Sequence, residues 1–367
     1  GIDLIVPAYR VDVQRPCDVV EDILRIYGYN NVEIPSELKS SLTIAGDSDK
    51  DYKRENLVGE QLVGEGFNEI LNNSLTKTSY YDKDELNKYP WAKTVKLMNP
   101  LSADLGVMRQ TLLFGGLESI KRNINRKAHN LKFFEVGNCY WFNEQKHSPE
   151  APIKAYTQDN HMALWVTGKR VEGSWAHPDE DSSVYELKAY VENIFRRVGV
   201  PQGMFVEKTS DNNIFDKAIT IENHGGKIIA EYGIVNHKIL KSFDIEQQVF
   251  YADIDWQALM KAVRKNKLEF KEISKFPAVS RDLALLVDEN VQFAQIEEIA
   301  RQTEKKLLKR VELFDVYTGD KLPSGKKSYA VNFILQDENK TLNDKAIDAI
   351  MKKLIHQLTT KLKAELR

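Results

Sequence analysis

Three carboxylates at helical spacing near the start of the chain are residues whose types could support chemistry. Asp18, Glu21 and Asp22 lie at positions i, i+3 and i+4 of a segment whose apolar spacing predicts a helix ending before Gly28. The dipole of a helix favours negative charge in its first turn, but three clustered carboxylates repel one another, and a hard cation such as Mg²⁺ would relieve that repulsion. The alternative is an ordinary helix start, with Asp18 as N-cap and Glu21 at the third helical position. By themselves the residues favour this alternative.

A pair of adjacent lysines is the second candidate. Lys326 and Lys327 follow the turn sequence Pro323-Ser324-Gly325, between segments 311–317 and 328–335. Both segments are rich in β-branched and aromatic residues, so they predict a hairpin. Lysines on a hairpin can hold phosphates. On physical grounds alone, such a pair is more often a solvated surface.

Patterns for other chemistry are absent from the sequence. No Walker-type loop, dinucleotide fingerprint, or serine or cysteine nucleophile motif occurs. Cys17 and Cys139 are the only cysteines, which excludes paired zinc ligands and a disulfide framework, and the seven histidines show no metal-ligand spacing. The chain therefore offers no complete catalytic constellation of its own.

Composition sets wide bounds on the class of protein. With 367 residues and 42% hydrophobic content, the chain is long enough for two or three domains. The formal net charge of −2 gives no general signature of nucleic-acid binding, although residues from Ser274 onward hold 17 Lys and Arg against 14 Asp and Glu. No signal peptide or long apolar run occurs, so we expect a reducing cytoplasm and no membrane. The chain opens at Gly1 rather than Met, which predicts a fragment of a larger protein.

The elements that must position the two lysines lie in the last hundred or so residues. Residues 281–288 alternate as a strand does, and apolar residues from Ile296 to Leu308 then recur at helical spacing. The hairpin follows, and then a helix from Ile347 to Leu362, opened by Thr341 with Asp344 as a weak capping box. A short fourth strand is expected at 364–367. The order β-α-β-β-α-β is that of a ferredoxin-like domain.

The preceding residues mix both kinds of element. A strand is expected at 6–13, helices at 53–65 and 182–198, and strands at 131–141, 161–167 and 227–235. This mixture predicts an α+β fold. Breaks in composition near 33–41 and 264–267 divide the chain into segments 1–40, 41–268 and 269–367.

The C-terminal segment carries several motifs in a fixed order. These are Lys275-Phe276-Pro277, Arg281-Asp282-Leu283-Ala284, Leu313-Phe314-Asp315-Val316-Tyr317, Leu322-Pro323, Gly325-Lys326-Lys327-Ser328 and the closing Leu366-Arg367. Together they resemble the ferredoxin-fold anticodon-binding domain of bacterial phenylalanyl-tRNA synthetase β subunits. The resemblance implies contacts with tRNA(Phe), for which we predict Arg281, Lys326, Lys327 and Tyr329.

The middle segment resembles another part of the same subunit. Its motifs are Asn99-Pro100-Leu101-Ser102, Met108-Arg109-Gln110-Thr111-Leu112, Phe133-Phe134-Glu135-Val136-Gly137 and Ala252-Asp253-Ile254-Asp255. They are similar to the β subunit's copy of the class II synthetase fold, an antiparallel sheet with helices. An active class II enzyme needs arginines that meet the charge on the ATP phosphates. Here the strand continues as Tyr140-Trp141-Phe142, so we predict an inactive module without catalytic residues.

The N-terminal run from Pro7 to Tyr29 resembles the end of the winged-helix-like domain that precedes this module. In that family four acids bind a Mg²⁺ ion shared with the α subunit, and the matching positions are Asp12, Asp18, Glu21 and Asp22. Because the partner would complete the site, the resemblance implies weak or absent metal in this chain alone.

The resemblance covers nearly the whole chain and implies a β-subunit fragment of phenylalanine–tRNA ligase. Such a fragment would support the catalytic α subunit, which binds ATP and phenylalanine, and would position tRNA(Phe) within a heterotetramer of two α and two β subunits. Two alternatives stay open, a non-catalytic RNA-binding or regulatory paralogue and a stand-alone class II-type ligase.

Overall fold

The computed structural model describes residues 1–37, 46–81, 88–201, 203–266, 270, 272–319 and 322–366. By its internal packing the chain divides into two compact units, Gly1–Lys267 and Leu268–Arg367. The boundaries expected after residues 40 and 268 lie outside the described residues. The division into three segments therefore stays a prediction. Among the described residues, no helix combines the length and the apolar character that crossing a membrane requires.

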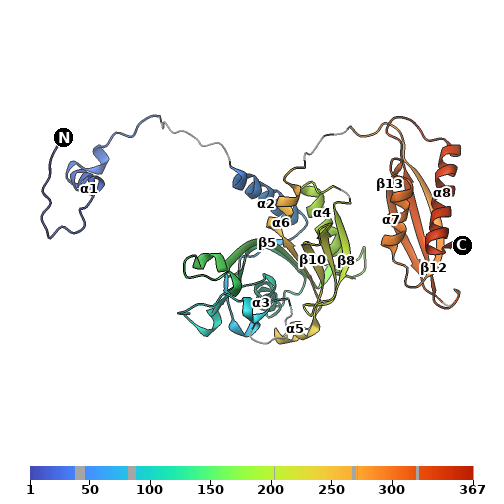
Figure 1. Ribbon diagram of the computed structural model, residues 1–367, viewed down its shortest axis with the longest axis horizontal. Coiled ribbons are helices and arrows are strands. Elements are labelled where there is room, and N and C mark those ends of the chain that lie inside the picture. The colour runs from blue at the N-terminus through green and yellow to red at the C-terminus, as the bar shows by residue number, and fades with distance from the viewer. Residues whose placement is uncertain are drawn as a thin grey trace. The chain divides into compact units, whose positions relative to one another are not determined.

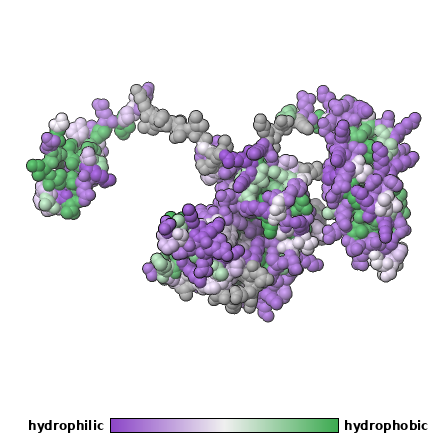
Figure 2. Space-filling model, viewed as in Figure 1, coloured by the Kyte–Doolittle hydropathy of each residue, from purple (hydrophilic) through white to green (hydrophobic). Residues whose placement is uncertain are grey.

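The N-terminal segment, residues 1–37, is built around one helix, α1 (Pro16–Tyr27). Pro16 takes the first helical position, where its missing N–H is tolerated, and Gly28, with φ of 93°, ends the helix. No residue of α1 is buried, and Figure 2 shows hydrophobic atoms gathered on this segment. The prediction of a strand at 6–13 is wrong. These residues form turns and irregular backbone, and no described strand lies beside them to form backbone hydrogen bonds.

A seven-stranded sheet forms the centre of the first unit, antiparallel except for the parallel pair β1–β4. In spatial order its strands are β1 (Asn68–Glu69), β4 (Leu131–Phe142), β5 (Tyr156–Thr167), β11 (Val249–Asp255), β10 (Ile228–Val235), β9 (Phe215–Asn223) and β8 (Phe205–Ser210). Two short ladders accompany it, β2 (Leu75–Thr76) with β3 (Val107–Met108), and β6 (Lys169–Val171) with β7 (Glu180–Asp181).

Helices cover both faces of this sheet, as Figure 1 shows. One face packs against α2 (Asp47–Gly64), α4 (Val184–Arg197) and α6 (Trp256–Val263), and the other against α3 (Leu113–Ile124) and α5 (His237–Ser242). Successive side chains of a strand point to opposite faces, so Phe134 belongs to the first core and Phe133 to the second. The helices predicted at 53–65 and 182–198 and the strands predicted at 131–141, 161–167 and 227–235 are confirmed.

The second unit is a four-stranded antiparallel sheet with two helices, in the order β13-β14-β12-β15. Its elements are β12 (Val279–Asp288), α7 (Phe293–Thr303), β13 (Leu308–Tyr317), β14 (Lys326–Leu335), α8 (Asp344–Leu362) and β15 (Glu365–Leu366). Both helices pack on one face, where Leu285, Val331 and Leu354 share a core. The predicted β-α-β-β-α-β order and the α+β fold class are confirmed.

Two local predictions for this unit are wrong. Leu308 opens β13 instead of closing the preceding helix, which ends at Thr303. Leu308 is buried in the core, and burial satisfies an apolar residue equally in a helix or a strand, so spacing alone could not decide. The N-cap of α8 is Asn343, whose side-chain oxygen accepts a hydrogen bond from the Ala346 N–H at 2.9 Å, rather than Thr341.

Candidate functional site

The sheet of the second unit has one face on which neither helix packs. Cross-strand neighbours share a face, and the pairs Ala284 with Ala330 and Leu286 with Ser328 lie opposite the core side. Three of these four side chains are small and form a floor in the middle of the sheet, in which Ser328 is only 7% exposed and the two alanines are half-buried. A flat floor on a four-stranded sheet can accommodate planar rings, as the sheets of RNA-recognition modules do.

The edge strand β13 borders this floor with aromatic and acidic side chains. Tyr317 lies opposite Ser328 and Asp315 opposite Ala330, so both belong to the face with the small residues. The pairing register of β13 with β14 shifts between Leu313 and Asp315. Phe314 lies at this irregularity and is 60% exposed. A β-bulge of this kind re-aims side chains at a sheet edge. Sequence reasoning quoted these residues only as part of a motif; the alternation and the turn after Tyr317 were the signal that could have singled them out.

Acids outnumber bases on this floor and its rim. Among the residues that the structure describes in this sheet, the register places Asp282, Asp288, Glu312, Asp315 and Glu365 on this face, against the two cations Arg310 and Lys326. Both cations are paired, Arg310 with Glu312 at 3.1 Å and Lys326 with Glu365 at 2.6 Å. The face can therefore accept hydrogen bonds from base edges. It is poorly suited to hold phosphates.

The structure does not bring the four predicted tRNA-contacting residues together. Lys326 lies opposite Asp288, whereas Arg281 lies opposite Phe333, at the other end of the ladder. Seven residues of strand separate these ends, a distance of about 20 Å. Arg281 is 3.7 Å from Asp344 at the start of α8.

Tyr329 departs most from its prediction. Its side chain is 6% exposed, and its hydroxyl donates a hydrogen bond to the Val291 carbonyl oxygen at 3.1 Å. The Lys327 ammonium lies 4.9 Å from the centre of the ring. A ring enclosed in this way offers no face to a base, because the core takes one side and Lys327 lies over the ring. The structure therefore gives no support to the role predicted for Tyr329.

At the N-terminal segment, arginines engage the four predicted metal-binding acids. The Arg10 guanidinium contacts Asp12 at 3.0 Å and Asp22 at 2.7 Å, and these hydrogen bonds raise its pKa. The Arg25 guanidinium contacts Glu21 at 2.7 Å.

Asp18 has a structural task of its own. It lies at the third helical position, not at the N-cap, and accepts hydrogen bonds from the backbone N–H groups of Gln14 and Arg15 at 3.0 and 2.8 Å. The Arg15 guanidinium, 3.0 Å away, and these two backbone donors hold the pKa of Asp18 well below its usual range. The cap assignment made from the sequence is therefore wrong by one turn.

As arranged, these acids do not fit a metal ion. Within the part of the chain that the structure describes, no three His, Cys, Asp or Glu side chains are grouped so as to hold one. Arg10 occupies the position between Asp12 and Asp22, and the other two carboxylates are bonded elsewhere. Mg²⁺ binding by these four residues would require the arginines to release them.

The central sheet holds a buried polar face that sequence reasoning missed. Arg109, 5% exposed, contacts Glu135, fully buried, at 2.6 Å, and its other N–H groups donate to the carbonyl oxygens of Asn138 and Asn72. A Cβ on Gly137 would lie only 2.2 Å from the Arg109 guanidinium, so a larger residue here would displace that guanidinium from its partners. Glu135 in an apolar strand was the signal, because a buried charge needs a partner.

Two further pairs lie on the same face. Lys88 contacts Glu231, which also accepts hydrogen bonds from Ser210 and Asn212. His161 on β5 lies 2.8 Å from Asp253 on the neighbouring strand β11. Burial lowers the pKa of His161, but the charge of Asp253 and the hydrogen bond to it raise that pKa above its ordinary value. Each of these cations is neutralised within the fold.

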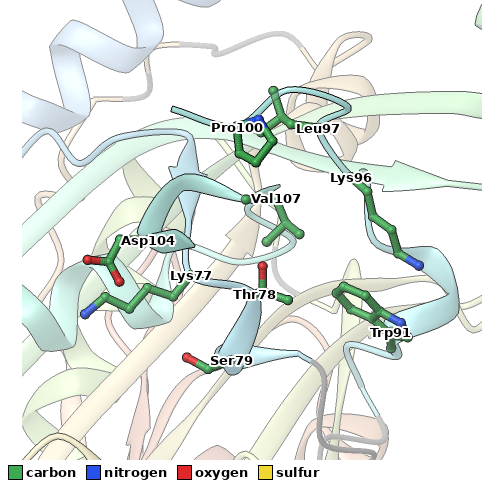
Figure 3. Close-up of a pocket in the computed structure, with 10 residues that line it drawn as sticks. Lys77, Thr78, Ser79, Trp91, Lys96, Leu97, Pro100, Asp104 and Val107 are labelled. Atoms are coloured by element: carbon green, nitrogen blue, oxygen red, sulfur yellow. The ribbon is translucent and has the colours of Figure 1, made fainter. Parts of the chain in front are cut away.

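A cavity of about 490 Å³ lies beside the β2–β3 ladder, as Figure 3 shows. Thr78 and Val107 line its centre, and Lys96 lies over the Trp91 ring at 4.1 Å. A second cavity, of about 550 Å³, is lined by His237 and Asp216 among others. In the second cavity His237 Nδ1 lies 3.3 Å from an Asp216 carboxylate oxygen, and both side chains are exposed.

The two units thus define a class: an α+β protein with a charge-neutralised central sheet and a ferredoxin-fold unit whose open face suits planar ligands. Comparisons with known proteins agree with this description. A family described as the phenylalanyl tRNA synthetase beta chain CLM domain matches residues 34–256, the ferredoxin-fold anticodon binding domain matches residues 274–367, and the tRNA synthetase B5 domain matches residues 1–29.

The comparisons also found curated relatives, two of which follow, and solved structures, one of which is given after them. The phenylalanine–tRNA ligase β subunit of Bacteroides fragilis is 63% identical over 367 residues, which is 100% of this chain and 44% of the relative. That of Porphyromonas gingivalis is 51% identical over 364 residues, 99% of this chain and 44% of the relative. The crystal structure of pyrrolysyl-tRNA synthetase from Desulfitobacterium hafniense aligns with a TM-score of 0.43 and 13% identity, covering 60% of this chain and 74% of that one.

The chain belongs to the phenylalanine–tRNA ligase β-subunit family. It spans less than half the length of the curated relatives that it matches.

Proposed function

We propose that this chain acts within a phenylalanine–tRNA ligase, where it binds tRNA(Phe) through the open sheet face of its second unit. The observation that carries the proposal is the floor of Ala284, Ala330 and Ser328 bordered by Phe314 and Tyr317, in a unit that matches an anticodon-binding family. Unstacked bases could lie on this floor and stack on the aromatic rings, and Asp315 could accept hydrogen bonds from a base edge.

Chemistry in this proposal belongs to a partner α subunit that binds ATP and phenylalanine. Supporting this, the cations on the buried face of the central sheet, Arg109 and Lys88, are already bonded to internal acids. Stabilising charge on a nucleotide phosphate requires free, preorganised cations. The first unit would then serve as scaffold and subunit interface in a heterotetramer of two α and two β subunits.

A Mg²⁺ ion shared with the α subunit belongs to the same proposal. Asp12, Asp18, Glu21 and Asp22 would hold it only after Arg10, Arg15 and Arg25 release them, so a partner must supply the change. Isothermal titration should show no tight Mg²⁺ binding by this chain alone. Tight binding by the isolated chain would contradict the shared site.

The test of the proposal combines a partner and a substrate. The chain should co-purify with a phenylalanine–tRNA ligase α subunit. It should also bind tRNA(Phe) more tightly than a tRNA(Phe) with an altered anticodon. Failure to associate with the α subunit, together with retained RNA binding, would favour a regulatory paralogue. ATP–pyrophosphate exchange by the chain alone would favour a stand-alone ligase. A cytoplasmic location, which cell fractionation tests, is part of this proposal.

A further inference from the structure

Trp175 of the first unit lies in the loop between β6 and β7, and its side chain is 100% exposed. The other tryptophans are covered to different degrees: Trp165 and Trp256 are buried, and Trp91 and Trp141 are partly buried. An indole ring removes about 150–250 Å² from water when it packs, so tryptophan is usually well covered. Packing within this unit does not explain why a tryptophan stands at this position.

The loop that carries Trp175 is held by hydrogen bonds. The Asp179 carboxylate accepts a hydrogen bond from the Gly173 N–H at 2.5 Å and contacts the Lys169 ammonium. Within the loop, the Ser174 N–H donates to the His177 carbonyl oxygen at 2.9 Å. The backbone beneath the exposed indole is therefore fixed before a partner binds, which lowers the entropy that binding costs.

A second exposed aromatic residue follows the hairpin. The Ser182 N–H donates to the Gly168 carbonyl oxygen at 3.0 Å, which ties the end of the hairpin to its start. Helix α4 then begins, and Tyr185 in its first turn is 79% exposed. Leu187 and Val191 take the other side of α4 in the core. One continuous segment, residues 169–185, thus presents two large aromatic side chains to solvent.

The charge of the hairpin is negative. Residues 169–181 contain the acids Glu172, Asp179, Glu180 and Asp181 and the cations Lys169 and Arg170. Both cations are paired within the hairpin, Lys169 with Asp179 and Arg170 with Glu180 at 2.9 Å. The two surplus acids would repel a phosphate backbone. They complement a protein surface that carries basic side chains.

We propose that Trp175 anchors the β6–β7 hairpin in an apolar pocket of the α subunit, with basic side chains at the rim of that pocket. The inference rests on the proposed function, because it takes the α subunit as the partner, and it adds which residue of the first unit makes the contact. A tryptophan in a loop that is already ordered has the properties of a binding hot spot, which are a large apolar area, one N–H donor and little entropy to lose.

The first experiment measures the affinity of the complete chain for a phenylalanine–tRNA ligase α subunit by biolayer interferometry. Trp175→Ala should weaken association at least about 30-fold, the size of a hot-spot contact, and Trp175→Phe should weaken it less. The matched control, Ile153→Ala, removes another apolar side chain of the first unit that is 82% exposed, and it should bind as the parent chain does. Urea midpoints should be unchanged in all three variants, because neither side chain belongs to a core. Parent-like affinity in Trp175→Ala overturns the inference.

A second experiment observes the ring directly through its fluorescence. Acrylamide quenches exposed indoles, so the difference in quenching between the parent chain and Trp175→Phe reports the exposure of Trp175. This difference should be large for the free chain and should disappear when the α subunit is bound. A difference that persists in the complex contradicts burial of the ring.

Failure of the inference can be told apart from failure of the proposed function. If the α subunit binds the parent chain and Trp175→Ala equally, the partner is right and the anchor is wrong. If the parent chain does not bind the α subunit, both are wrong. Shielding of Trp175 by tRNA(Phe) alone, or by self-association of the chain at high concentration, would also overturn the assignment of the pocket to the α subunit.

Discussion

The central sheet and the C-terminal sheet treat charge in opposite ways. On the central sheet, Arg109, Lys88 and His161 lie on a covered face, and each has an acidic partner on a neighbouring element. On the C-terminal unit, acids such as Asp282, Glu312 and Asp315 lie on the open face of the sheet. Burial forces neutralisation because an unpaired charge away from water is costly. A charged side chain that is already paired inside the fold cannot bind a ligand, whereas an exposed charged side chain can.

The largest effect is expected at the buried pair of the central sheet. Arg109→Ala should lower the free energy of unfolding by about 3–5 kcal/mol, because it leaves Glu135 buried and uncompensated. Urea denaturation measures the change. The matched control, Arg170→Ala, breaks an ion pair with Glu180 in which both side chains are more than half exposed, and it should change much less. Equal losses in the two variants would mean that burial does not distinguish the pairs.

Next in size is the aromatic border of the C-terminal floor. Tyr317→Ala and Phe314→Ala should each weaken tRNA(Phe) binding by about 1–3 kcal/mol if the ring stacks on a base. Filter binding or fluorescence anisotropy measures the change. Tyr329→Phe removes the hydroxyl that bonds Val291 and should affect unfolding, not RNA affinity. If Tyr329→Phe lowers the affinity for tRNA(Phe) and the other two variants do not, the binding site would be the one predicted from the sequence.

A smaller, pH-dependent effect is expected at His161. Because its pKa in the folded chain is raised, mainly by Asp253 against the opposing effect of burial, folding favours the protonated form. The stabilisation is complete below the unfolded-state pKa and is lost as pH rises through the folded-state pKa. His161→Gln should therefore destabilise the chain more at about pH 5.5 than at about pH 9. A pH-independent difference in urea midpoints would contradict the pairing.

The smallest effect is expected at the hairpin lysines. Lys326 is already bonded to Glu365, which raises its pKa, and Lys327 lies against Tyr329. Lys326→Ala with Lys327→Ala should lower the salt slope of tRNA binding by at most about 2. A larger change in the slope would show that the hairpin makes more phosphate contacts than these two lysines alone supply.

Much of this architecture could be predicted from local patterns. The alternation at 281–288 and 328–335 and the helical spacing around Leu354 determined the β-α-β-β-α-β order, because each element has to bury one face. The same reasoning could not predict the residue at which the first helix of that unit ends. Leu307 and Leu308 satisfy a helical and an extended spacing alike, and only pairing with β14 assigns Leu308 to a strand.

Candidate sites were less predictable than elements. The sequence contained Asp12, Asp18, Glu21 and Asp22 at suitable spacing, but spacing does not reveal which arginine each one bonds. Tyr329 was predicted from the resemblance to an anticodon-binding domain, yet strand alternation and the core decide which face its ring takes.

By itself, the sequence determined the kinds of elements, their order and the family motifs, because these depend on residues close together along the chain. Only the tertiary structure decided which charges are available. Arg109 and Glu135 are 26 residues apart, and Lys88 and Glu231 are 143 apart, so their neutralisation exists only once the sheet has brought them into contact.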